Sequence, residues 1–108
     1  DTMLNNRPRK RFTRDNVLKE KNDAGVYTLY DKCGKRMYVG RTSGSEYSGL
    51  KKRLSSYYQK DDLNGEHNEK KALRKHGIAY YSTTPIKDKK KRRQVEKKRK
   101  KGTMFNIL

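Results

Sequence analysis

The apolar residues of this chain are confined to short segments that alternate with clusters of basic residues. Segments 26–30, 37–39 and 78–86 are rich in β-branched and aromatic residues, whereas 87–101 is almost wholly basic. Low apolar content with high net charge is also typical of disordered chains. Because the two kinds of residue are segregated here, we expect a small folded core with a cationic exterior.

The net charge of the chain predicts a polyanionic partner. Its 108 residues include 30 Lys and Arg against 12 Asp and Glu, a formal charge of +18, and only 30% of the residues are apolar. Such an excess opposes compaction by self-repulsion. Nucleic acid is the usual partner that relieves it.

Several classes of protein are excluded by what the sequence lacks. No apolar run approaches the ~20 residues of a membrane-spanning helix, so we expect no membrane partner. Cys33 is the single cysteine and cannot form an internal disulfide. We therefore expect a reducing, intracellular location, cytoplasmic or nucleoid-associated. Cys33, His67 and His76 are too few and too scattered for a structural zinc site.

Periodicity and turn residues predict an α/β (α+β) fold, with a small three-stranded antiparallel sheet flanked by helices. Strands are expected at 25–30, 35–41 and 78–86, and helices at 14–20, 48–60, 69–76 and 88–101. Residues 1–23 are interpreted as a basic N-terminal tail (1–12) and a short helix that buries Val17 and Leu18. Residues 24–108 are interpreted as one domain.

The first two strands are expected to form a hairpin around a four-residue turn at 31–34. That turn would place Tyr27 directly opposite Tyr38, on the same face of the sheet. Aromatic cross-strand pairs also stabilise sheets without any catalytic role, so the pair by itself leaves both interpretations open.

The last predicted helix contains a lone acid among many cations. Residues 89–101 include ten Lys or Arg, and Glu96 is their only carboxylate, next to the only apolar residue, Val95. Glu96 can act as an i±4 ion-pair partner for Arg92 and Lys100. Alternatively, it can ligate Mg²⁺ together with waters and a substrate phosphate.

Two arginines occupy positions where a charge needs a partner. Arg53 lies at the edge of an apolar helical arc, so it could pair with Asp61 or Asp62 or bind a phosphate. Arg41 follows the second strand at the start of a loop, where functional groups often lie.

The order of these residues resembles the GIY-YIG nucleases, over about residues 24–108. The stretch 50–57 is similar to the N-terminal nuclease domain of the bacterial excision-repair incision enzyme. The motifs that carry the resemblance are Gly25-Val26-Tyr27, Tyr38-Val39-Gly40, Arg41, Arg53, Tyr57, Glu96 and Asn106. Both motif isoleucines are valine in this chain.

The resemblance implies phosphodiester hydrolysis with one divalent metal, Mg²⁺ or Mn²⁺, held by Glu96. It implies Tyr27 as the general base, with Tyr38 as the alternative, and Arg53 as the ligand of the scissile phosphate. Arg41 would take a second phosphate oxygen, Tyr57 would orient the phosphate or a water, and Asn106 would support Glu96. A free phenol of pKa ~10 is scarcely ionised at neutral pH, so activity should rise toward alkaline pH.

We therefore expect an endonuclease with one site per monomer, acting as a monomer or weak dimer. It should act on DNA rather than RNA and show weak sequence preference, because backbone contacts carry no base code. The residues expected to bind nucleic acid are Arg41, Lys52, Arg53, Lys90, Arg93 and Lys97. The alternative is a non-catalytic basic module associated with ribosomes or DNA.

Overall fold

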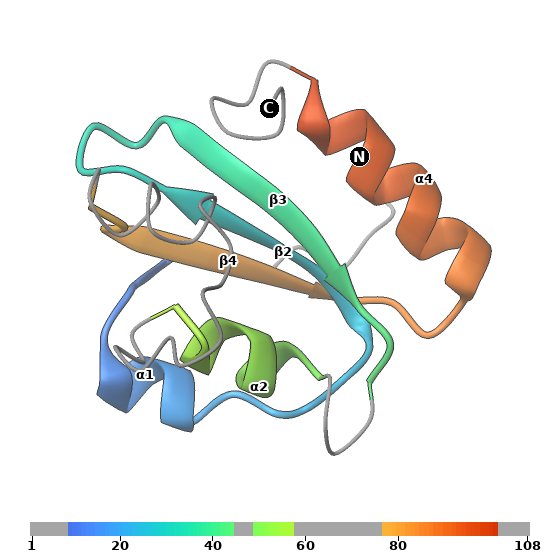
Figure 1. The fold of residues 1–108 in the computed structure, drawn as a ribbon, viewed down its shortest axis with the longest axis horizontal. Coiled ribbons are helices and arrows are strands. Elements are labelled where there is room, and N and C mark those ends of the chain that lie inside the picture. The colour runs from blue at the N-terminus through green and yellow to red at the C-terminus, as the bar shows by residue number, and fades with distance from the viewer. Residues whose placement is uncertain (1–8, 45–48, 58–76, 102–108) are drawn as a thin grey trace, which may run out of the picture.

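A computed structural model describes residues 9–44, 49–57 and 77–101. The elements in chain order are β1 (Lys10–Arg11), α1 (Arg14–Leu18), β2 (Gly25–Tyr30), β3 (Arg36–Thr42), α2 (Leu50–Ser55), β4 (Tyr80–Pro85) and α4 (Lys89–Lys100). The strands form one antiparallel sheet in the order β1-β4-β2-β3 (Figure 1). The α+β fold is thus confirmed, and the helix expected at 69–76 lies outside the described residues.

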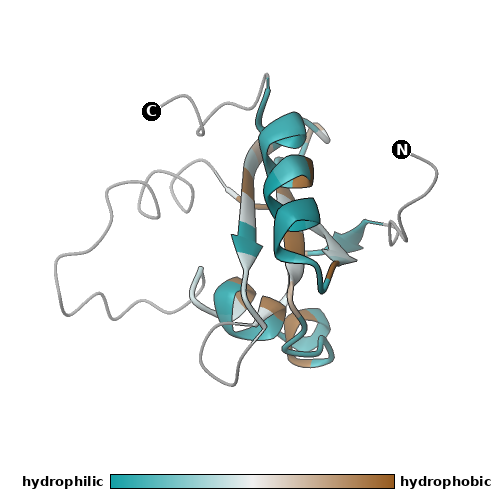
Figure 2. Cartoon of the chain, turned by 90° about the vertical axis from the view of Figure 1, so that its right-hand side faces the viewer, coloured by the Kyte–Doolittle hydropathy of each residue, from teal (hydrophilic) through white to brown (hydrophobic). Residues whose placement is uncertain are grey.

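The sheet separates two layers of helices, with α4 on one face and α1 and α2 on the other (Figures 1 and 2). The α4 face buries Val26, Val39 and Ile86, against which the half-buried Val95 packs. The other face carries the larger core cluster, made of Val17, Tyr27, Leu29, Met37, Leu50, Leu54, Tyr57 and Tyr81. Helix α4 is almost entirely hydrophilic in Figure 2, so Val95 is its main apolar anchor to the sheet.

The hairpin of β2 and β3 differs in register from the expected one. Tyr27 pairs with Gly40 and Leu29 pairs with Tyr38, so the two tyrosines are diagonal neighbours rather than opposite. Tyr30 pairs with Arg36, which leaves five residues in the turn instead of four, and a bulge follows between Leu29 and Tyr30. An odd turn alone would put the tyrosines on opposite faces, but the extra bulge residue restores the shared face.

The side chain of Asp31 organises this five-residue turn. Its Oδ1 accepts hydrogen bonds from the backbone N–H groups of Cys33 and Lys35, each at 2.9 Å. Gly34 adopts a φ of +81°, a conformation that residues with a Cβ rarely adopt. The turn residues were therefore recognisable, but the number of residues between the paired positions was not.

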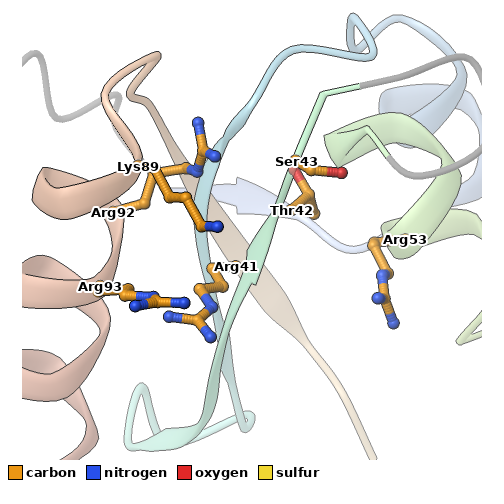
Figure 3. A pocket seen from close by; sticks show the side chains of 7 residues that line it. All are labelled: Arg41, Thr42, Ser43, Arg53, Lys89, Arg92 and Arg93. Atoms are coloured by element: carbon orange, nitrogen blue, oxygen red, sulfur yellow. The ribbon is translucent and has the colours of Figure 1, made fainter.

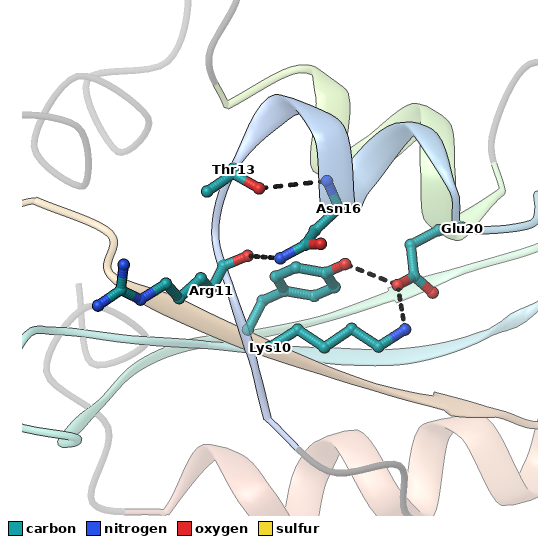
Figure 4. Close-up of polar contacts among 6 residues, drawn as sticks. Lys10, Arg11, Thr13, Asn16 and Glu20 are labelled. Atoms are coloured by element: carbon teal, nitrogen blue, oxygen red, sulfur yellow. Dashed lines mark hydrogen bonds and ion pairs between the residues drawn. The ribbon is translucent and has the colours of Figure 1, made fainter.

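The prediction of a tail over residues 1–12 is wrong for Lys10 and Arg11. These residues form β1, which pairs with Tyr81 and Tyr80 at the edge of the sheet. Glu20 fastens β1 to the core, because its Oε2 accepts hydrogen bonds from Tyr81 Oη at 2.6 Å and from Lys10 Nζ at 2.9 Å (Figure 4). The sheet thus has four strands rather than three, while the domain boundary at residue 24 stays a prediction.

Helix α1 begins as expected but buries only one of its two predicted core residues. Thr13 caps the helix by accepting a hydrogen bond from the N–H of Asn16 (Figure 4). Val17 is fully buried, whereas Leu18 is 48% exposed. The prediction for Leu18 is wrong because a five-residue helix presents only a narrow stripe to the sheet.

Candidate active site

Three tyrosines form a cluster on the face of the sheet that α2 covers. The hydroxyl groups of Tyr27 and Tyr57 are hydrogen-bonded at 2.8 Å, and both residues are buried. The ring of Tyr38 lies 6.2 Å from that of Tyr27 and 6.4 Å from that of Tyr57, between centroids. Tyr38 is partly exposed. The cluster thus presents phenol groups that differ in their access to solvent.

The glycines of the two motifs have a steric explanation. A Cβ on Gly40 would lie 2.4 Å from Oη of Tyr27, so the phenol occupies the space above this glycine. A Cβ on Gly25 would lie 2.4 Å from the backbone oxygen of Thr84, which belongs to the neighbouring strand β4. Gly25 therefore permits close strand pairing, and Gly40 permits the position of Tyr27.

On the opposite face of the sheet, β3 contacts α4 through an ion pair. Arg41 Nη1 lies 3.6 Å from Glu96 Oε1, and Lys100 Nζ lies 3.7 Å from Glu96 Oε2. The predicted ion pair of Glu96 with Lys100 is thereby confirmed. Arg92 instead donates to the backbone oxygens of Ile86 and Lys87, at 3.1 and 2.7 Å.

A cavity of about 220 Å³ lies at the end of β3, between α2 and α4. Its lining residues are Arg41, Thr42, Ser43, Arg53, Lys89, Arg92 and Arg93 (Figure 3). The side chains of Arg41 and Arg93 extend toward each other, and Arg53 comes from α2 on the other side of β3 (Figure 3). Five cationic side chains and no carboxylate line this cavity, which makes it suited to an anion.

The structure brings the predicted residues together in two groups. Tyr27, Tyr38 and Tyr57 form one group, and the other contains Arg41, Arg53 and Arg93 at the cavity, with Glu96 beside Arg41. Because β3 is an edge strand, groups from both faces of the sheet can meet at its end.

Other predicted residues lie away from the cavity or outside the described part of the chain. Lys52, Lys90 and Lys97 are exposed and do not line the cavity. Asn106 lies outside the described residues, as do Asp61 and Asp62, the alternative partners of Arg53.

Sequence reasoning missed Thr42, Ser43, Lys89 and Arg92 as lining residues. A signal existed for Arg92, which lies three residues before Val95 and therefore on the same side of α4. The sequence alone does not distinguish Arg92 from the other basic residues of 89–101, because basic residues surround it on both sides. Nothing in the sequence marked Ser43 apart from its place in a polar loop.

The described residues offer few oxygen ligands for a divalent metal near the cavity. Among the described residues, no group of three His, Cys, Asp or Glu side chains gathers. Glu96 has a 15% exposed side chain, and its ion pairs of 3.6 and 3.7 Å are looser than hydrogen bonds. One accessible carboxylate fits Mg²⁺, which commonly keeps several waters and takes its other oxygens from substrate phosphates.

Known structures with the same architecture were identified by comparison. The GIY-YIG N-terminal endonuclease domain of UvrC from Thermotoga maritima, as a point mutant bound to its catalytic divalent cation, superposes with a TM-score of 0.64. The match covers 88% of this chain and 94% of that one, at 20% identity. The chain has the GIY-YIG fold.

A second structure of the same UvrC domain, bound to magnesium as its catalytic divalent cation, matches the GIY-YIG fold of this chain with a TM-score of 0.62. This match has 20% identity and covers 85% of this chain and 92% of the other. No protein family's sequence profile matches the chain, and no curated protein matches it in sequence. Within the described ranges, no helix is long and apolar enough to cross a membrane.

Proposed function

We propose that this protein is a metal-dependent endonuclease that hydrolyses phosphodiester bonds of DNA, with one active site per monomer and weak sequence preference. The observation that carries the proposal is the position of Arg41. It lines the cationic cavity together with Arg53 and also contacts the lone carboxylate of Glu96. Cations suited to a phosphate and a carboxylate suited to a divalent cation thus lie side by side, on the fold that an endonuclease domain also has.

The two arginines at the end of β3 supply the phosphate contacts. Arg53 would hold the scissile phosphate, and Arg41 would bind a second oxygen of the same group. Guanidinium groups form paired, charge-assisted hydrogen bonds with phosphate oxygens. They would stabilise the additional negative charge that develops as water attacks phosphorus.

Tyr27, in its phenolate form, would accept the proton of the attacking water and become a neutral phenol, with Tyr38 as the alternative base. The water oxygen forms its bond to phosphorus while the bond to the leaving 3′ oxygen breaks. Tyr57 Oη lies 2.8 Å from Tyr27 Oη, so the Tyr57 hydroxyl can donate a hydrogen bond to the proposed base. Tyr57 would therefore orient the base as well as the phosphate.

Glu96 would hold one Mg²⁺ or Mn²⁺ ion, which would supply charge stabilisation to the leaving oxygen. Asn106 would support Glu96 from the C-terminal segment. A ligand set of one carboxylate leaves the remaining coordination positions to waters and the substrate. The metal should accordingly bind weakly in the absence of nucleic acid.

Exposed cations away from the cavity would bind the backbone of the substrate. Lys52 on α2 and Lys90 and Lys97 on α4 are exposed to solvent. If about six phosphates are neutralised in total, the logarithm of the binding constant should fall with log salt at a slope near −5. DNA is proposed over RNA, in a reducing, intracellular compartment compatible with the exposed free thiol of Cys33.

The experiment that tests the proposal is plasmid nicking. Supercoiled plasmid is incubated with wild type, Glu96→Gln or Asp15→Asn in Mg²⁺ or Mn²⁺, with an EDTA control. Asp15 is an exposed carboxylate in the first turn of α1 and serves as the matched control. Nicked circle should form with wild type and Asp15→Asn and be lost with Glu96→Gln and with EDTA.

Equal nicking by Glu96→Gln would contradict the assignment of the metal ligand. If no protein nicks DNA in any metal and all bind it equally, the non-catalytic binding module becomes the better description. The two outcomes are separated by a gel-shift measurement on the same plasmid.

A further inference from the structure

The α4 side of the cavity contains cations that have no part in binding the scissile phosphate, which is assigned to Arg41 and Arg53. Lys89, Arg92 and Arg93 line it from the first residues of α4, and we call these three residues the α4 wall. Across the cavity from them lie Arg41, Thr42 and Ser43, at the end of β3 (Figure 3). Positively charged side chains from β3, α2 and α4 therefore line the cavity.

The α4 wall places cations in and just after the first turn of the helix, where positive charge is unfavourable. The first turn of a helix carries a partial positive charge, which favours acidic residues there. The first turn of α4 contains no acidic residue, and Asp88 satisfies the helix only by capping the N–H of Lys90 at 2.9 Å. Repulsion among these charges weakens the folded state, and an anion between them would remove that penalty.

Arg92 is the fixed part of this wall. Its residue is only 9% exposed, and its Nη1 is held by the carbonyl oxygens of Ile86 and Lys87. These two contacts place the guanidinium at the cavity before any ligand arrives, so little side-chain entropy is lost on binding. Arg93 and Lys89 are exposed and can adjust around a ligand.

The size of the cavity fits an oxyanion. Its volume of about 220 Å³ is more than ten times the ~10–15 Å³ that one water needs on the same kind of measure. Cations line the cavity both from the α4 wall and from Arg41 and Arg53. The cavity therefore has room for a second phosphate beside the scissile one.

We propose that the α4 wall binds a phosphate of the nucleic-acid strand other than the one that is cut. This inference rests on the proposed function, in which Arg41 and Arg53 take the scissile phosphate. The second phosphate would fix the direction and register of the strand across the end of β3. It is bound equally before and during the reaction, so the α4 wall should affect KM rather than kcat.

The test uses the double variant Lys89→Gln/Arg93→Gln. Its matched control is Lys91→Gln/Lys98→Gln, which removes the same charge from exposed positions of α4 that do not line the cavity. A labelled DNA oligonucleotide is titrated in EDTA at several salt concentrations, so that no chemistry intervenes. Inorganic phosphate is added separately in a thermal unfolding assay at constant ionic strength.

In the expected result, the cavity variant binds the oligonucleotide at least tenfold more weakly than the control variant. Its salt slope should be shallower by about 0.7–0.9 for each phosphate contact removed. Phosphate should raise the melting midpoint of wild type and the control, and this rise should shrink in the cavity variant. In cleavage assays the cavity variant should show a higher KM with an unchanged kcat.

Equal oligonucleotide binding by the two variants would overturn the inference. A second outcome would also overturn it: the cavity variant loses the phosphate-induced rise in melting midpoint but binds the oligonucleotide as tightly as the control. The cavity would then bind a free oxyanion and not the nucleic-acid strand. Failure of the proposed function looks different: wild type would bind through the α4 wall in EDTA and nick no DNA in any metal.

Discussion

Arg41 and Glu96 lie 3.6 Å apart, from guanidinium Nη1 to carboxylate Oε1, and connect the edge strand β3 to α4. Both side chains are partly exposed, 42% and 15%, so the pair contributes little to stability. The pair matters because each of its residues also belongs to the candidate site. Arg41 also faces the cavity, and Glu96 is the carboxylate proposed to hold the metal. If Glu96 holds the metal as proposed, the same ion pair would oppose metal binding until Arg41 has another anion to contact.

This arrangement predicts that Arg41→Gln binds Mn²⁺ more tightly than wild type in the absence of nucleic acid. Arg41 lies 3.6 Å from the Glu96 carboxylate, and in an exposed setting this ion pair is worth about 1 kcal/mol of attraction that a metal must displace. Its removal should therefore raise the affinity for Mn²⁺ about fivefold. Mn²⁺ binding is followed by electron paramagnetic resonance or calorimetry. Arg41→Gln should nevertheless cleave DNA more slowly, since a phosphate contact is lost.

Lys100→Gln is the matched variant for this prediction. Its ammonium lies 3.7 Å from Glu96 but does not line the cavity. Mn²⁺ affinity should therefore rise as in Arg41→Gln, while cleavage is retained. Unchanged Mn²⁺ affinity in both variants would argue against Glu96 as the metal ligand.

The contact between Tyr27 and Tyr57 predicts coupled effects of removing their hydroxyl groups. Tyr27→Phe and Tyr57→Phe should each abolish or strongly reduce nicking while the protein stays folded. Each should cost about 1–3 kcal/mol of unfolding free energy, because the remaining hydroxyl loses a buried 2.8 Å hydrogen bond. The double variant should cost less than the sum of the two single variants.

Tyr38→Phe completes this series. Tyr38 is partly exposed, so its change should affect stability less than the other two. Loss of nicking in Tyr38→Phe alone, with activity retained in Tyr27→Phe, would assign the general base to Tyr38 instead.

Gly40→Ala should reduce cleavage at least tenfold by displacing the phenol of Tyr27. The added Cβ would lie 2.4 Å from Tyr27 Oη, and overpacking of this kind costs about 1–3 kcal/mol. Tyr81→Phe is the control, since it loses the hydrogen bond to Glu20 next to β1 and Tyr81 does not line the cavity. Both variants should unfold more easily, measured by urea denaturation, but only Gly40→Ala should lose activity beyond that effect.

The contact of Tyr81 with Glu20 predicts a loss of stability at alkaline pH. Burial, followed by the hydrogen bond to the Glu20 carboxylate and its charge, raises the pKa of Tyr81 well above the ordinary value of 10. The unfolded chain therefore releases this proton from about pH 10, while the folded protein still holds it. The stabilisation is fully present below pH 10 and is lost progressively as pH rises above it.

Urea denaturation at a series of pH values above neutrality measures this effect. Tyr81→Phe should be less stable at neutral pH, because the 2.6 Å hydrogen bond to Glu20 is lost. Its stability should also fall less steeply than that of wild type above pH 10. Parallel curves for the two proteins would contradict the assignment.

The local sequence was sufficient to predict much of this fold, because helix caps and strands depend on neighbouring residues. Thr13 and Asp88 cap α1 and α4, because the side-chain oxygen of each accepts a hydrogen bond from a backbone N–H in the first turn. The alternation of side chains along a strand predicted that Tyr27 and Tyr38 share one face of the sheet. The ordered motifs pointed to the GIY-YIG fold that the structural comparison shows. The two-residue strand β1 was missed because Lys10 and Arg11 have no apolar pattern that would mark them as a strand.

The arrangement of the candidate site was decided by tertiary structure. The exact register of Tyr38 depends on a bulge that compensates a five-residue turn, and no local signal fixed that combination. The cavity joins residues from β3, α2 and α4, whose proximity follows from which helices cover which face of the sheet. The sequence determined which chemical groups are present, from the tyrosines to the lone Glu96. The tertiary docking of α4, through Val95 and through the hydrogen bond of Arg99 to Thr84, brought Glu96 and Arg93 to β3. A helix of cations carries too little apolar pattern to reveal this docking position.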